Sequence, residues 1–495
     1  MRQFLAKILV AGFSILLSGC VSQKVIDNDI SRTGNRAYNE WKMHHASRDS
    51  LARDSSSVQP NSYEKPGSEN VPLISGKLTL HDAMKLALIY NRNLRKAVEE
   101  KSYAHGQILS SYGNLTPTAN VNGTYTRKNA VNTFNFGGNQ FQSGFLNNYS
   151  VTLSIEQPII DARGVLGLRA SQLYKTLTDK QIQTATENTL YQVEQQYYHV
   201  LMLQKQYNVR QSNVKYSQAS LNDVKNKVKF GTATHFNLIR AQVDLSNAKT
   251  QKIQAKNQLE QAKAAFFNTL GVSQNSQVVL DDSLDYQSTK TNEGKAIQTA
   301  LQNRPDLASS KLNVELQKSS LKSMYARYLP TVSAYFDQTW ANPAPLTIPP
   351  SQTWGYLWNA GLQLNWSIFN LDREGSIMQE RSTLRQQQLN LLDAHQQVIY
   401  DVHSAVMALQ NAEQSVEAQK LTVQQATEGL KLAQAQFKQG TIDQVSLLEA
   451  RQALSEAQLS YYSSLYQHKI ARLDLLRATG QLEMNFPKNN SDSSE

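Results

Sequence analysis

The chain has 495 residues, a formal net charge of +10 and 18% charged residues. A positive charge of this size raises the possibility of a nucleic-acid partner. The lysines and arginines, however, are interleaved with acidic residues along the predicted helices and form no basic run. We therefore interpret them as solvated helix faces and expect no nucleic-acid partner. The single cysteine, Cys20, excludes disulfides and cysteine metal sites.

The N-terminus indicates export. Arg2 and Lys7 are followed by an apolar run at residues 8–17, which is about half the length of a membrane-spanning helix and is typical of a signal peptide. Leu17-Ser-Gly-Cys20 resembles the bacterial lipobox. We therefore predict a lipoprotein signal peptide at 1–19 and a covalent lipid on Cys20. An ordinary secretory peptide with an incidental cysteine is the alternative. Val21 in place of Asp favours the outer membrane, by resemblance to the lipoprotein sorting rule.

Residues 20–77 are polar and show little periodicity, which predicts a lipid-anchored leader. Beyond the signal peptide no apolar stretch approaches 18 residues, so we expect no transmembrane helix in the mature chain. A chain of this kind that crosses a membrane must do so as β-strands.

An internal repeat begins near residue 78. Residues 87–94 match 300–307 at an offset of 213, and Gly231-Thr232 matches Gly440-Thr441 at an offset of 209. Gly271 matches Gly480, also at 209. We predict two repeats, 78–285 and 286–482, and a disordered C-terminal tail at 483–495.

Each repeat has the same predicted order of elements. A helix (79–113, then 293–327) leads into two strands (119–128 and 149–155, then 331–340 and 358–366). A long helix (163–229, then 373–438) runs to the Gly-Thr turn, and a return helix follows (236–269, then 443–479). Both long helices carry apolar residues spaced by seven, and both return helices carry small ones, which predicts coiled-coil packing. The apolar positions are Val193, Val200, Tyr207, Val214, Leu221, Val228 and, 209 residues later, Val402, Leu409, Val416, Val423, Leu430, Phe437.

The strands have the pattern of a membrane barrel. Apolar and polar residues alternate in 149–155 and 358–366, over a length that crosses hydrocarbon when tilted. A soluble hairpin with one buried face shows the same alternation, and the exported context favours the barrel. Four strands cannot close a barrel, because the smallest have eight. Two or more subunits are therefore required.

Three duplicated or ordered motifs stand out: Leu78-Thr-Leu-His-Asp-Ala-Met-Lys-Leu-Ala87, Ala300-Leu-Gln-Asn-Arg-Pro-Asp-Leu307, and Phe437-Lys-Gln-Gly-Thr441 followed by Val445-Ser-Leu-Leu-Glu-Ala450. With these motifs the chain resembles the TolC-type outer-membrane efflux family over residues 78–482. The resemblance implies a mixed α+β membrane protein: a homotrimer with a shared twelve-strand barrel and a periplasmic tunnel of coiled-coil helices. It also implies a periplasmic adaptor and an inner-membrane pump as partners. The nine histidines and the carboxylates show no catalytic spacing, and the sequence has no glycine-rich phosphate-binding loop, so we expect no enzymatic activity and no cofactor beyond the lipid.

The same resemblance implies functional residues at the two Gly-Thr turns. Gly231, Thr232, Gly440 and Thr441 are the expected adaptor contacts at the helix tips. The family's acidic gate positions correspond to Asn237, Ser446 and Glu449, and its basic position to Ile442, so only Glu449 keeps its charge. Asp443 and Arg240 are charged neighbours that can substitute in the gate.

Two other functions fit parts of the pattern. A type I secretion duct for polypeptides has the same architecture, because the pump selects the cargo. A lipid-anchored periplasmic coiled-coil scaffold would explain the helices but not the strands of membrane length.

Overall fold

A computed structural model describes residues 71–281, 283–289, 291–346 and 351–482. The predicted signal peptide, Cys20, most of the leader and the tail lie outside these residues. The described chain divides into two units. In the smaller, residues 71–76 and 272–278, the backbone N–H of Ser273 donates to Pro72 O at 3.0 Å. The larger unit, residues 77–271 and 279–482, contains the main sheet and the long helices.

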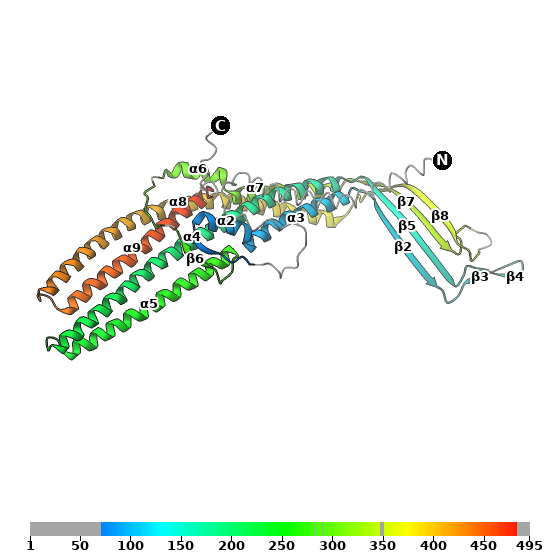
Figure 1. The fold of residues 1–495 in the computed structure, drawn as a ribbon. Coiled ribbons are helices and arrows are strands. Elements are labelled where there is room, and N and C mark those ends of the chain that lie inside the picture. The colour runs from blue at the N-terminus through cyan, green and yellow to red at the C-terminus, as the bar shows by residue number, and fades with distance from the viewer. Residues whose placement is uncertain (1–70, 282, 290, 347–350, 483–495) are drawn as a thin grey trace, which may run out of the picture. The chain divides into compact units, whose positions relative to one another are not determined.

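Four strands form one antiparallel sheet in the order β2-β5-β7-β8 (Figure 1). Their bounds are β2 Thr118–Arg127, β5 Asn147–Ile160, β7 Thr331–Asn342 and β8 Gly355–Asn365. All four predicted strands are confirmed, and β5 is twice as long as expected. The pairing of β5 with β7 joins the two repeats, so β2 and β8 form the two edges of the sheet.

The register of β5 shifts between Pro158 and Ile160. Proline has no N–H to donate to a neighbouring strand, so within a sheet it is confined to edges and irregularities of this kind. At the other end of β5, Tyr149 lies opposite Tyr125, and the two rings stack with centroids 4.9 Å apart.

Two helices of 68 residues dominate the larger unit: α4 (Ala162–Lys229) and α8 (Leu371–Lys438). At 1.5 Å per residue each is about 100 Å long. They are followed by the return helices α5 (His235–Leu270) and α9 (Gln444–Ala478). The heptad prediction is confirmed, since every predicted seam position is buried or half-buried, and Val193 and Val402 are fully buried.

The shorter predicted helices, 79–113 and 293–327, are wrong as single elements. The first is split into α2 (Leu80–Tyr90) and α3 (Arg92–Gly113), and the second into α6 (Glu293–Asn303) and α7 (Pro305–Ala326). Asn91 separates the first pair: its side chain accepts from Leu94 N at 2.9 Å and donates to Thr269 O at 2.7 Å. Arg304 separates the second pair, because the proline that follows disfavours a helical conformation at this position.

The long helices and the helices that pack along them lie side by side in a row (Figure 1). Beside the sheet the order is α3-α4-α7-α8, and toward the hairpin turns it is α5-α4-α9-α8. Within the described chain, α5 and the C-terminal half of α8 therefore end the row: α5 packs extensively along α4, and α8 along α9. The sheet has the same two-edged arrangement.

A linker at residues 281–292, described except at 282 and 290, connects the repeats across α8 and α9. The backbone N–H of Thr289 donates to Glu413 Oε1 at 2.8 Å, and the Tyr286 hydroxyl donates to Glu417 Oε1 at 3.3 Å. The Tyr286 ring meets the buried His468 edge-on, with ring centroids 5.0 Å apart.

Two pairs of strands were not predicted. Strands β3 (Asn132–Phe136) and β4 (Asn139–Ser143) form a hairpin between β2 and β5, and β1 (Ser75–Leu78) pairs with β6 (Gln277–Leu280).

Gly271, which matches Gly480 in the second repeat, ends α5 with a φ of +74°, and a Cβ there would lie 2.2 Å from Tyr90 O. Only glycine permits this approach between α5 and α2.

None of the helices in the described ranges combines the length and the hydrophobicity that a membrane crossing requires.

Candidate functional site at the hairpin turns

The first hairpin turn is closed by backbone hydrogen bonds at the end of α4. Gly231 has a φ of +74° and donates its N–H to Val228 O at 3.0 Å. Thr232 donates its N–H to Lys227 O at 2.8 Å, and its hydroxyl donates to the same oxygen at 3.0 Å. This is a Schellman motif, whose left-handed residue favours glycine. The threonine adds a second donor to a carbonyl that the helix leaves unpaired.

The second turn repeats this geometry 209 residues later. Gly440 also has a φ of +74° and donates to Phe437 O at 3.2 Å. Thr441 donates both its N–H and its hydroxyl to Gln436 O, each at 3.0 Å. All four residues of the two turns are exposed. The predicted tip residues therefore form two equivalent, solvent-facing ends.

The predicted gate positions lie in the first turns of the return helices, where capping determines the local structure. Thr234 caps α5 and accepts from the backbone N–H of Asn237 at 3.3 Å. Asp443 caps α9 and accepts from both the backbone N–H of Ser446 (2.9 Å) and its hydroxyl (2.7 Å). Asn237 and Ser446 thus occupy equivalent third positions of the two helices.

The structure brings Asp443 and Arg240 near each other. The hydrogen bonds from Ser446 hold the pKa of Asp443 below its usual value, and the positive charge of Arg240 lowers it further. Glu449 lies one turn beyond Ser446 and is exposed. A role of these residues in a gate stays a prediction.

Two cation–π contacts join the hairpins, one beside the turns and one further along the helices. The Lys227 ammonium lies 4.5 Å from the centroid of the Phe437 ring, and the Arg451 guanidinium lies 5.0 Å from that of Tyr216. Burial lowers the pKa of Arg451. The first turn and the second are consequently parts of one surface.

Further from the turns, α4 and α9 meet in a polar contact, here called the internal joint, between residues 188–216 and 451–477. The Tyr191 hydroxyl donates to Asp474 Oδ1 at 2.7 Å, and burial together with this carboxylate raises the pKa of Tyr191 to about 12. Burial also raises the pKa of Glu194 to about 7, although Arg472 and Lys469 lower it. Sequence reasoning missed this joint, because its residues look like those of any polar helix face.

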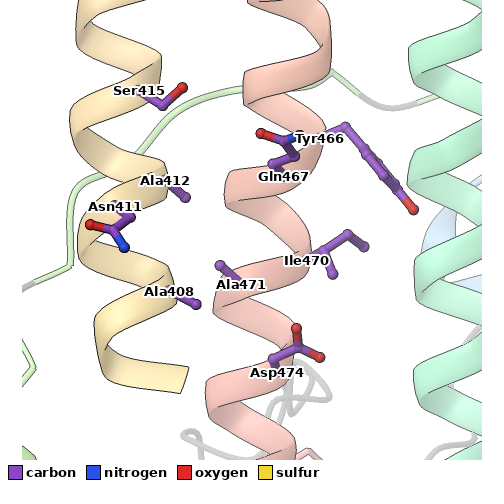
Figure 2. A pocket seen from close by; sticks show the side chains of 9 residues that line it. All are labelled: Ala408, Asn411, Ala412, Ser415, Tyr466, Gln467, Ile470, Ala471 and Asp474. Atoms are coloured by element: carbon purple, nitrogen blue, oxygen red, sulfur yellow. The ribbon is translucent and has the colours of Figure 1, made fainter. Parts of the chain in front are cut away.

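A groove of about 450 Å³ lies between α8 and α9 beside the internal joint (Figure 2). It is lined by small and uncharged residues and one carboxylate: Ala408, Asn411, Ala412 and Ser415 of α8, and Tyr466, Gln467, Ile470, Ala471 and Asp474 of α9. The described residues contain no group of three or more His, Cys, Asp or Glu side chains that could hold a metal ion. The groove offers packing space and one acidic group.

Comparisons with known proteins agree with this architecture. The sequence model of the outer membrane efflux protein family matches residues 83–272 and 296–481. The chain is 21% identical to the probable efflux pump outer membrane protein TtgC of Pseudomonas putida over 81% of this chain and 82% of the relative. It is 24% identical to the outer membrane protein TolC of Salmonella enteritidis, over 83% and 84%. The crystal structure of the Campylobacter jejuni CmeC outer membrane channel superposes with a TM-score of 0.69 at 17% identity, covering 81% of this chain and 85% of that one.

Proposed function

Because the chain belongs to the outer membrane efflux protein family, we propose that it forms the outer-membrane duct of a three-part efflux assembly. Three copies make one passive channel. The channel receives cargo from a periplasmic adaptor and an inner-membrane pump and releases it outside the cell. Its relatives include an efflux pump outer membrane protein and an outer membrane channel, which supports the transport role. Its family consists of channels and not of enzymes.

The two-edged row of strands and helices is the observation that carries this proposal. In the sheet, β2 pairs with β5 and β8 pairs with β7, so each edge strand has one free side within the described chain. Lipid cannot satisfy the N–H and C=O groups of a free edge. Further copies that pair β8 with β2 remove both edges. Three copies give twelve strands, the number that the family resemblance implies.

The residues of the sheet suit a lipid surface. Leu362 and Leu364 of β8 are 71% and 64% exposed in the single chain. Trp358, on the same face of the strand, is 59% exposed. Apolar side chains with this exposure on one strand face are typical of an outward lipid-facing band with aromatic ends. A lipid on Cys20 would anchor the chain in the same membrane.

The helix tips are the proposed contact with the adaptor. Gly231, Thr232, Gly440 and Thr441 present two equivalent, exposed ends that the adaptor can contact. The gate lies beside them, with Glu449 as its first candidate and Asp443 with Arg240 as the second. We also propose that the two repeats of the duct subunit comprise residues 78–285 and 286–482.

Oligomer mass and conductance test the proposal together. Native mass spectrometry of the detergent-solubilised protein should give three chains, and planar bilayers that contain it should show discrete channel currents. A mass of one or two chains, or membranes without currents, would refute the duct. Drug accumulation in a deletion strain then separates small-molecule efflux from polypeptide secretion, because only the former raises intracellular drug levels when the duct is lost.

A further inference from the structure

The linker at residues 281–292 covers a buried histidine that has no polar partner. His468 of α9 is 1% exposed, and within the described residues neither of its ring nitrogens has a hydrogen-bond partner. The Tyr286 ring of the linker meets it edge-on, with ring centroids 5.0 Å apart. A buried polar group without partners loses its hydrogen bonds to water and gains none in return, so it lowers the stability of the docked linker. An apolar side chain would pack there at lower cost.

The first repeat contains such an apolar side chain. At the repeat offset of 209, His468 corresponds to Leu259 of α5, which is 3% exposed. The carboxylates of α8 that hold the linker are amides in α4: Glu413 and Glu417 correspond to Gln204 and Asn208. Titratable side chains therefore occupy the positions that the linker covers, while the same positions of the other repeat carry side chains that do not titrate.

The hydrogen bonds that dock the linker are few and exposed. Glu413 accepts the backbone N–H of Thr289 at 2.8 Å, and Glu417 accepts the Tyr286 hydroxyl at 3.3 Å. Each such bond to solvent-exposed groups stabilises the docked linker only modestly. The contact between Tyr286 and His468 is consequently able to decide whether the linker stays in place.

The charges around His468 come from four elements. They are Tyr286 of the linker, Glu413 and Glu417 of α8, Lys469 and Arg472 of α9, and Glu194 of α4, which interacts with the same two cations. Burial holds the pKa of His468 below its ordinary value of 6.5; Glu413 raises the pKa, and Lys469 and Arg472 lower it further. At neutral pH the covered imidazole is therefore uncharged.

We propose that the linker is an acid-sensitive strap across α8 and α9, which protonation of His468 releases. An imidazolium needs water or a carboxylate to stabilise its charge. It reaches water only when the Tyr286 ring moves away, and when it pairs with Glu413 it competes with the N–H of Thr289. Both responses remove a contact of the linker. The strap acts within one chain and does not require the duct.

The direction of the pH dependence follows from the buried position of the ring. The docked state disfavours the proton, so the released state binds it more readily. Docking is complete above the ordinary histidine pKa of 6.5 and weakens as the pH falls through the lower pKa of the covered ring. Release exposes the ring and both carboxylates of α8 to water without breaking the chain.

The mobility of a spin label on the linker tests this release. Gln287→Cys, at an exposed position of the linker, is labelled with a nitroxide at neutral pH in the full-length protein. Its EPR spectrum is then recorded from about pH 8 to about pH 5, which spans the range of histidine titration. Wild-type protein treated in the same way reports any label on the native Cys20. Ser110→Cys, at an exposed position of α3, is the matched control site.

We expect the linker label to be immobile at the alkaline end of this range and mobile at the acid end, with the control label unchanged. His468→Leu introduces the residue of the first repeat and should keep the linker label immobile throughout. Glu413→Gln retains an oxygen that can accept from Thr289. It should preserve the release but move its midpoint to lower pH, because the Glu413 carboxylate raises the pKa of His468.

Four results would overturn the strap. The wild-type linker label is already mobile at the alkaline end, or it stays immobile at the acid end. The control label becomes mobile together with the linker label, which would indicate general unfolding. The linker of His468→Leu is released at the same pH as that of the wild type, which would assign the release to another group. The wild-type titration decides the first three results even when the His468→Leu protein does not fold.

Discussion

Glu194 is an acidic group that the folded protein holds in an unfavourable place, and its removal should stabilise the protein. It lies on α4 at the internal joint, where it is half-buried. Burial raises its pKa from 4.5 to about 7, although Arg472 and Lys469 oppose the shift. At pH 8 the folded chain must therefore keep an ionised carboxylate in a position that disfavours the charge.

The sign of the pH dependence follows from the two pKa values. Well below pH 4.5 the side chain is protonated in both the folded and the unfolded states, and its burial does not lower the stability. As the pH rises from 4.5 through about 7, the unfolded chain ionises first and stability falls. The resulting loss in the free energy of unfolding is at most roughly 3 kcal/mol per copy, at about 1.36 kcal/mol per pKa unit.

We expect Glu194→Gln to raise the melting temperature by several degrees at pH 8 and to change it little at pH 4.5. The assay is thermal unfolding of the detergent-solubilised protein by intrinsic fluorescence at a fixed scan rate. Glu428→Gln, at an exposed position of α8, is the matched control and should change little at either pH. A variant that is less stable than wild type at pH 8 would show that Arg472 and Lys469 dominate, and would refute the reasoning.

Four further predictions address the anchor, the sheet, the gate and the packing of α2. Cys20→Ala should abolish acyl labelling while leaving oligomers intact, and a mature N-terminus mapped to any other residue would contradict lipidation. Leu362→Arg should impair assembly by about 2–4 kcal/mol if its side chain lies at mid-membrane. Gln363→Arg, on the opposite face, should be mild; equal yields of heat-labile oligomer on a gel would mean that the strand faces are assigned wrongly. Glu449→Gln should lower the cation preference of single-channel currents, most clearly at low salt where screening is weakest, and unchanged selectivity would remove Glu449 from the duct wall. Gly271→Ala should lower the melting temperature, because the added Cβ would lie 2.2 Å from a backbone oxygen of α2 at a φ of +74°; an unchanged value would refute the close approach.

The order and length of the long helices were predictable because the same sequence pattern occurs in both repeats. The heptad seam and the Gly-Thr turns occur in both repeats at one offset, and a pattern that recurs in register restricts helix length and turn position together. The break at Arg304 was also readable, since Pro305 follows it. The break at Asn91 was not, because its geometry depends on a hydrogen bond to Thr269, 178 residues away.

The candidate site shows the same division between local and distant information. Asp443 and Ser446 have the spacing of a helix cap, which sequence alone can suggest. The proximity of Arg240 to Asp443, and the burial of Glu194, depend on how two hairpins align side by side. No local pattern reports such an alignment, so these features emerged only from the structure.

The linker at 281–292 makes the internal joint a contact within one chain. By joining the repeats it holds α9 near α4 at a high effective concentration, so the internal joint forms without the loss of translational freedom that separate chains must overcome. Such a contact tolerates a destabilising buried carboxyl group such as Glu194. A contact between copies forms only when separate chains meet, so its free energy of association must also offset the loss of translational freedom. Selection would then act more strictly on α5 and α8, which end the row of helices, than on the joint inside the chain, and half-length chains cut at the linker should assemble only at much higher concentration.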